Sequence, residues 1–160
     1  FKRIEKMNPQ VDLSFYHTFA LRKVGYKSRV EFIKYYLESL KEEGKDIGLV
    51  IIDGVADLVS DVNNLEESND IVQEIMSLTT IYDCHIVTVI HSNWGSDKPT
   101  GHLGSLLEKK TETQIKLAYD TLTKSVSVNC MRSRNSSFEP FSFNITEGGL
   151  PMFVKNDYPM

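Results

Sequence analysis

Gly48-Leu49-Val50-Ile51-Ile52-Asp53-Gly54 is the stretch that decides the fold of this chain. Four apolar residues, three of them β-branched, run without interruption into an aspartate and a glycine. A short continuous apolar run of this kind predicts a strand buried on both faces, as in a parallel sheet. Asp53 then stands at the carboxyl end of that strand, which is the edge where open α/β sheets bind their ligands.

The Asp53 carboxylate has two interpretations. It could close a turn or cap a helix, because aspartate bonds to nearby backbone N–H groups. It could instead hold a phosphate-bound Mg²⁺, which is the role of the Walker B aspartate in P-loop ATPases. Many parallel strands end in aspartate, so the remainder of the chain has to decide between the two.

Length, composition and charge describe an ordinary globular protein. The 160 residues suffice for one compact core, and we expect a single domain over residues 1–160. A net charge of -4 gives no overall basic field for nonspecific nucleic-acid binding, although a local basic groove is compatible with it. We expect no membrane span and no signal peptide, and therefore a cytoplasmic protein. Cys84 and Cys130 are expected to be reduced core residues in strands.

Helical and strand patterns alternate on both sides of the central stretch. Apolar residues recur with helical period from Val30 to Leu40, and we expect this helix to begin at Ser28 and to end at Gly44. A second helix is expected up to Tyr82, followed by an apolar strand over His85–Ile90. A strand, a helix and a strand in this order predict a parallel sheet.

The two ends of the chain follow other patterns. We expect a strand around Leu13–Phe19, a short helix over Leu103–Lys110 and a poorly specified tail over Met152–Met160. Alternating apolar and polar residues predict three antiparallel strands, over Glu112–Tyr119, Ser125–Met131 and Pro140–Ile145. The fold class is therefore α/β, with a mostly parallel sheet flanked by helices and antiparallel strands at the carboxyl-terminal end.

Polar residues follow the ends of the two apolar strands, and such residues converge on one crevice in a parallel sheet. A carboxylate for a metal would lie there beside groups able to bind a terminal phosphate, and arginines on a projecting turn could reach the same charge from a neighbouring subunit. The candidates are Asp53, His91 and Asn93 at the strand ends, Lys98 and His102 in the loop that follows, and Arg132 and Arg134 beside a hairpin turn.

Four blocks in order carry a resemblance to a known family. They are LVIIDG (49–54), TVIHSN (88–93), GHLGSLLEKKTETQIKL (101–117) and RSRNSSFEPFSF (132–143). Together they resemble the carboxyl-terminal half of a RecA-like ATPase core of the RepA/DnaB-type replicative helicase group. Within that group the chain is similar to the ATPase-like proteins of Bacteroides-type mobilizable transposons. The resemblance extends from about Lys27 to Met152 and implies a RecA-like sheet.

The resemblance also implies a role for each candidate residue. Asp53 would be the Walker B aspartate that holds Mg²⁺ through water, and His91, with Asn93, would be the sensor that responds to the γ-phosphate. The loop with Lys98 and His102 would face DNA. Of Arg132 and Arg134, the second would act as an arginine finger across a subunit interface.

One part of the family pattern is missing, because the chain contains no G-x-x-x-x-G-K-[ST] phosphate loop (Walker A). A chain that begins at Phe1 is expected to be a fragment of a longer protein. We therefore expect ATP and Mg²⁺ to be cofactors of the full-length protein and neither to bind this fragment. The implied partners are DNA and further copies of the chain, in a homo-oligomer such as a hexamer. The alternative is a catalytically inactive binding or assembly module in a DNA-processing complex. Ala56 stands where the transposon family carries a basic residue, which removes any basic contact there.

Overall fold

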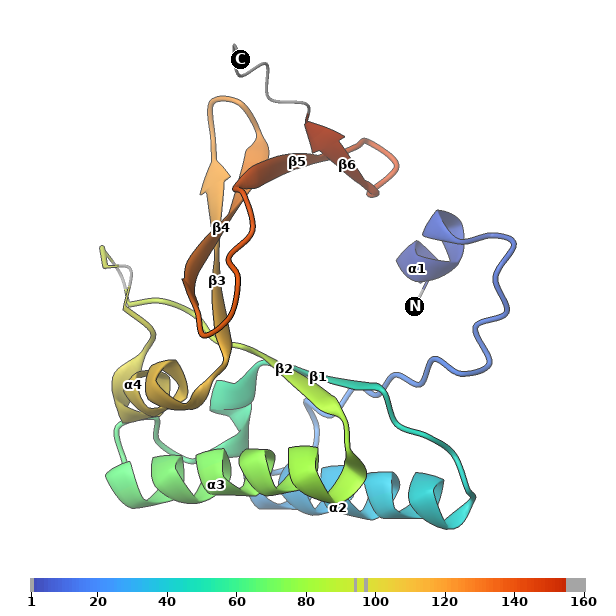
Figure 1. The fold of residues 1–160 in the computed structure, drawn as a ribbon, viewed down its shortest axis with the longest axis vertical. Coiled ribbons are helices and arrows are strands. Elements are labelled where there is room, and N and C mark those ends of the chain that lie inside the picture. The colour runs from blue at the N-terminus through green and yellow to red at the C-terminus, as the bar shows by residue number, and fades with distance from the viewer. Residues whose placement is uncertain (1, 94, 97, 155–160) are drawn as a thin grey trace. The chain divides into compact units, whose positions relative to one another are not determined.

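The computed structural model describes residues 2–93, 95–96 and 98–154. Contacts between Cα atoms divide the chain into two compact units. We call residues 20–110 the αβ unit, and residues 2–19 together with 111–154 the antiparallel unit. Each unit is described by itself, and Figure 1 shows the elements of both.

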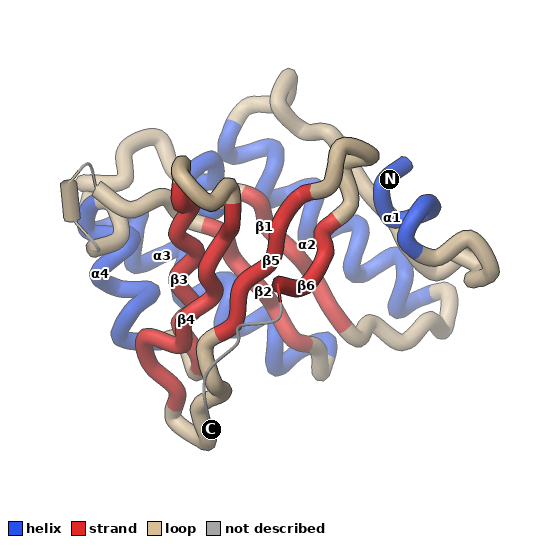
Figure 2. Tube along the Cα trace, turned by 90° about the horizontal axis from the view of Figure 1, so that it is seen from above, coloured by secondary structure: helices blue, strands red, loops and turns tan. Residues whose placement is uncertain are grey.

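The αβ unit contains the strand, helix and strand predicted from the sequence. Strand β1 pairs with β2 in parallel, in a register that aligns Leu49 with His85 and Asp53 with Val89. Helices α2 and α3 lie on one side of this two-stranded sheet (Figures 1 and 2). The elements are α2 (Tyr26–Glu42), β1 (Leu49–Asp53), the 3-10 helix η1 (Val55–Leu58), α3 (Leu65–Tyr82), β2 (His85–Val89) and α4 (Gly101–Lys110).

The observed bounds of α2 confirm the predicted end of this helix but not its predicted start. Gly44 has φ +70°, and its N–H donates to the Lys41 carbonyl oxygen at 2.9 Å, so the helix ends where predicted. The predicted start at Ser28 is wrong, because α2 begins at Tyr26. The Arg29 N–H already donates to the Gly25 carbonyl oxygen at 3.0 Å, which places Ser28 inside the first turn.

The core of the αβ unit lies between β1 and α3. Ile52, Val55, Val72 and Leu103 belong to one buried apolar cluster. The prediction that the central strand is buried on both faces is wrong. Leu49 and Ile51 are 56% and 58% exposed, since successive side chains of a strand point to opposite faces and residues of both α2 and α3 pack in the cluster that contains Ile52.

The antiparallel unit is a four-stranded sheet in the order β3-β4-β5-β6 (Figure 2). The predicted antiparallel strands are confirmed. The fourth strand, β6, lies where the sequence predicted only a poorly specified tail. Residues 155–160, the last part of that tail, lie outside the described residues. The elements are α1 (Lys2–Met7), β3 (Thr113–Asp120), β4 (Ser125–Ser133), β5 (Phe141–Ile145) and β6 (Pro151–Val154).

Strand register gives this sheet one apolar and one polar face. Leu117 pairs with Val128, and Val128 pairs with Phe141, so these three side chains share a face. Ser127 pairs with Ala118 and with Ser142 on the opposite face. Val128, in the middle of the apolar face, is buried, whereas Leu117 and Phe141 are exposed.

The predicted strand around Leu13–Phe19 is wrong. The Asp12 carboxylate accepts hydrogen bonds from the N–H and the hydroxyl of Ser14, both at 2.9 Å, and the Tyr16 N–H donates to the Leu13 carbonyl oxygen at 2.9 Å. These local turn contacts replace the ladder that a strand would need.

The cysteines match the expectation of core residues in strands only in part, because Cys84 lies outside the strand and Cys130 is not fully buried. Cys84 is buried just before β2, Cys130 is half-buried in β4, and both are free thiols. Burial raises the pKa of the Cys84 thiol, with a further contribution from Asp83.

None of the helices in the described part of the chain combines the length and the apolar character that a bilayer crossing requires.

Candidate functional site

Asp53 lies at the carboxyl edge of the parallel strands, as predicted. The side chain is exposed, and it points away from the core because its neighbour Ile52 is buried. A Cβ on Gly54 would lie 3.3 Å from the Val89 carbonyl oxygen, so the chain leaves β1 directly beside the end of β2.

The structure does not support the turn or cap interpretation of Asp53. Helix η1 follows Asp53, and its N-cap is Gly54, with no hydrogen bond from a capping side chain. Among the described residues, the Asp53 carboxylate accepts no hydrogen bond and forms no ion pair. No contact within the described chain therefore explains why a carboxylate stands at this strand end.

His91 and Asn93 follow β2 at the same edge, in a loop that closes on itself. The Thr100 N–H and hydroxyl both donate to the His91 carbonyl oxygen, at 3.1 and 2.8 Å. The Asn93 N–H donates to the Lys98 carbonyl oxygen at 2.9 Å, and Ser92 forms a bridge with Pro99. The Asn93 side-chain amide also donates to the Pro99 carbonyl oxygen, at 3.5 Å. The side chains of His91, Asn93 and Lys98 are exposed.

The GHLG block has a packing role. A Cβ on Gly101 would lie 2.6 Å from the Val62 carbonyl oxygen, and a Cβ on Gly104 would lie 2.5 Å from the Cβ of Pro99. Leu103 between them is completely buried. His102, which we placed in the preceding loop, lies in the first turn of α4, because the helix begins at Gly101. Its side chain is exposed.

Arg132 and Arg134 belong to the antiparallel unit. Arg132 pairs with Gln114 near the end of β4, and Arg134 follows the strand, with its N–H donating to the Glu112 carbonyl oxygen at 3.0 Å. The structure therefore brings Asp53, His91 and Asn93 to one edge within the αβ unit. It describes the two arginines only within their own unit.

The site offers one carboxylate to a metal. Nowhere in the described chain do three or more His, Cys, Asp or Glu side chains cluster as a metal ion would require. Mg²⁺ fits such a site when it keeps several waters and takes its other ligands from phosphate oxygens. Asp53 can contribute to that arrangement, with His91 and Asn93 as hydrogen-bonding groups in the loop that follows the next strand.

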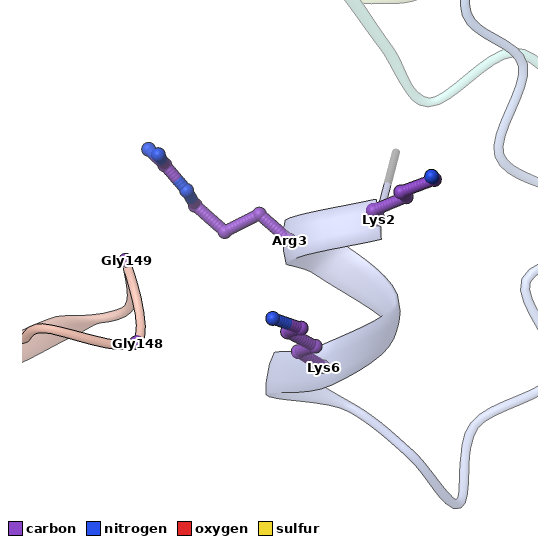
Figure 3. Close-up of a pocket in the computed structure, with 5 residues that line it drawn as sticks. All are labelled: Lys2, Arg3, Lys6, Gly148 and Gly149. Atoms are coloured by element: carbon purple, nitrogen blue, oxygen red, sulfur yellow. The ribbon is translucent and has the colours of Figure 1, made fainter.

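Sequence reasoning missed a second group of polar residues. Lys2, Arg3 and Lys6 of α1 line a hollow of about 270 Å³ together with Gly148 and Gly149, which lie in the turn between β5 and β6 (Figure 3). The signal was present in the sequence as three basic residues within five positions. The contact of α1 with a distant turn was not visible there.

A scan against protein-family models finds no match for this chain, and a search of curated proteins finds none either. Any functional conclusion therefore depends on the residues themselves. The two candidate functional sites are the carboxyl edge of the parallel strands around Asp53 and the basic hollow beside α1.

Proposed function

We propose that this chain supplies the metal-binding and phosphate-sensing side of a nucleotide site in a RecA-like ATPase. The full-length protein would be a DNA-associated helicase or loader that serves the replication or mobilisation of a mobile element. The observation that carries the proposal is the parallel register of β1 and β2, which brings Asp53 and His91 to one edge. The proposal is also supported by the order in which the four family-like sequence blocks follow one another along the chain.

The proposed chemistry is phosphoryl transfer from ATP to water, assisted by Mg²⁺. The Asp53 carboxylate would bind the waters of the metal ion. His91 and Asn93 would donate hydrogen bonds near the terminal phosphate, where negative charge develops. In an assembly of several copies, Arg134 would reach the same charge from a neighbouring subunit, with Arg132 beside it.

The alternative function is that of a protein without a phosphate loop anywhere in its full length. A protein that kept the fold without that loop would act as a binding or assembly module. Backbone N–H groups that converge on the phosphates supply much of the nucleotide affinity in P-loop proteins. ATP hydrolysis by the full-length protein distinguishes the two functions.

The test is the steady-state rate of ATP hydrolysis by the full-length gene product carrying Asp53→Asn. This change removes the negative charge and keeps the size of the side chain. We expect kcat to fall by about 10- to 100-fold, the range for a residue that acts on a metal through an intermediate ligand. Added Mg²⁺ should restore part of the loss if metal affinity is what the variant lacks.

Asp46→Asn is the matched control, because Asp46 is an exposed aspartate that precedes the same strand at its opposite end. Its hydrolysis rate should equal that of the unchanged protein. Equal rates for Asp53→Asn and Asp46→Asn would contradict the assignment of Asp53. A full-length protein without any hydrolysis would favour the assembly module.

A further inference from the structure

The basic hollow of the antiparallel unit brings together three positively charged side chains of one short helix, which also carries the acidic Glu5. Lys2 and Lys6 are four positions apart on α1, and Arg3 and Lys6 are three apart, so like charges are neighbours on a helix surface. Within the described chain, none of the three pairs with a carboxylate. Glu5, three positions from Lys2, offsets part of their mutual repulsion, and an anion from outside would offset more of it.

Charge is distributed unequally between the two units. Residues 2–19 and 111–154 carry seven basic and six acidic side chains, whereas residues 20–110 carry ten basic and fifteen acidic ones. The net charge of the αβ unit therefore repels an approaching anion, whereas the antiparallel unit is close to neutral, so its local charge clusters decide where an anion binds. The strongest local concentration of positive charge in the antiparallel unit is α1, with three basic residues and one acidic residue, Glu5.

The directions of the side chains indicate what kind of anion fits. Figure 3 shows Arg3 and Lys6 directed toward the Gly148–Gly149 turn, while Lys2 extends away from it. A small anion beside the turn would face Arg3 and Lys6, and a chain of linked phosphates could in addition reach Lys2. At about 270 Å³ the hollow is also smaller than the roughly 300 Å³ at which pockets for drug-sized ligands begin. It has room for the phosphate group of a ligand whose remainder stays outside.

The two glycines of the turn differ in what a side chain there would meet. Gly149 has φ +78°, and a Cβ there would lie 3.6 Å from the Arg3 guanidinium, in contact with the group that would bind the anion. A Cβ on Gly148 would meet only the Thr146 hydroxyl oxygen, at 3.8 Å. A side chain at position 148 is therefore tolerated by the fold.

We propose that α1 and the Gly148–Gly149 turn bind the phosphodiester backbone of a nucleic acid. Arg3 and Lys6 hold one phosphate in the hollow, and Lys2 contacts a neighbouring phosphate. The contacts are to charge alone, so binding is independent of base sequence and is strongly salt-dependent. This inference rests on the DNA-associated part of the proposed function, but it involves neither ATP nor Asp53.

The test is the fluorescence anisotropy of a labelled oligothymidylate of about 20 nucleotides, titrated with the protein without nucleotide between about 50 and 200 mM salt. The variant Lys2→Gln/Arg3→Gln/Lys6→Gln should bind about 10- to 100-fold more weakly. Its plot of log affinity against log salt should be shallower by about 1.4, which corresponds to two neutralised phosphates on a single strand. The control Lys23→Gln/Lys45→Gln/Lys110→Gln removes the same charge from exposed lysines of the αβ unit and should keep the slope.

A second pair of variants leaves every cation in place. Gly148→Asp introduces a carboxylate beside Arg3 and Lys6 and should weaken binding as the triple variant does, whereas the isosteric Gly148→Asn should bind like the unchanged protein. Equal affinity and slope in all variants would overturn the proposal. So would an equal loss in the control set, or an α1-dependent affinity for inorganic phosphate or phosphatidylserine vesicles without one for the oligonucleotide. Because no ATP is present, failure of the Asp53 assignment leaves these results unchanged.

Discussion

Glu67 connects the start of α3 to the loop that leads into it. The carboxylate accepts hydrogen bonds from the Ser60 hydroxyl, at 2.7 and 2.8 Å to its two oxygens, and from the Ser60 N–H at 2.8 Å. The Glu67 N–H donates to the Asn64 side chain, which caps the helix. Hydrogen bonds from the Ser60 hydroxyl, followed by those from its N–H, hold the pKa of Glu67 below its ordinary value near 4.5.

This lowered pKa predicts a pH dependence of stability. A carboxyl group with a lower pKa in the folded state stabilises the fold above its unfolded pKa, and that stabilisation is lost as pH falls through the folded value. We therefore expect Ser60→Ala to lower the free energy of unfolding at pH 7 and to have a smaller effect near pH 3. Denaturant titrations of both proteins across this range measure the difference.

Ser105→Ala is the control, because the Ser105 hydroxyl donates to the Gly101 carbonyl oxygen and has no carboxylate partner among the contacts described. Its effect on the free energy of unfolding should not change with pH. If Ser60→Ala shows the same effect at both ends of the range, Glu67 is not the titrating partner.

At the scale of elements, α4 depends on two close backbone approaches. A Cβ on Gly104 would lie 2.5 Å from the Cβ and 2.6 Å from the carbonyl carbon of Pro99, neither of which is the end of a flexible chain. In an exposed helix interior, alanine is better than glycine by about 0.5–1 kcal/mol. The clash with Pro99 outweighs this gain.

We predict that Gly104→Ala destabilises the protein by about 1–3 kcal/mol, the usual range for overpacking. Gly48→Ala is the matched control, since a Cβ there would meet nothing within 4 Å, and its effect should stay within about 0.5 kcal/mol. Chemical denaturation gives both values. A Gly104→Ala protein as stable as the unchanged one would contradict the packing role of the GHLG block.

The elements that sequence predicts best are those with a long periodic pattern and a clear end signal. Gly44 ended α2 as expected, and the apolar run before Asp53 formed a strand. Leu13–Phe19 failed because Asp12 and Ser14 form a local turn, which β-propensity does not register. The one-sided burial of β1 was also not predictable, since an apolar run does not say how many helices cover it.

For the candidate site, sequence predicted which edge of the sheet Asp53 and His91 share, because strand polarity alone determines it. It also singled out the GHLG block, but the role of these glycines became clear only from the distances to Val62 and Pro99. The α1 hollow was missed because it depends on a contact between residues almost 150 positions apart.

At the scale of the whole molecule, the two proposed activities lie in different units. Asp53 and His91 are in the αβ unit, and the basic hollow is in the antiparallel unit. The unequal charges of the units agree with this division, because nucleic-acid phosphates favour the less acidic unit. Each activity can therefore be removed without the other, by Asp53→Asn or by Gly148→Asp.

The central claim is that a metal–nucleotide complex binds at the carboxyl edge of β1 and β2. Mn²⁺ shares the oxygen ligands of Mg²⁺ and broadens the NMR signals of nearby nuclei, so it reports where the metal lies. The two ends of β1 provide an internal comparison, since Asp53 and Gly48 are about 17 Å apart along an extended strand.

The decisive measurement is the broadening of backbone amide signals in the full-length protein when Mn²⁺ is added with a nonhydrolysable ATP analogue. We predict the strongest broadening at Asp53, Gly54 and His91, and much weaker broadening at Asp46, Gly48 and His85 at the opposite edge. Broadening that is absent, that is equal at both edges, or that is confined to the antiparallel unit would contradict the account.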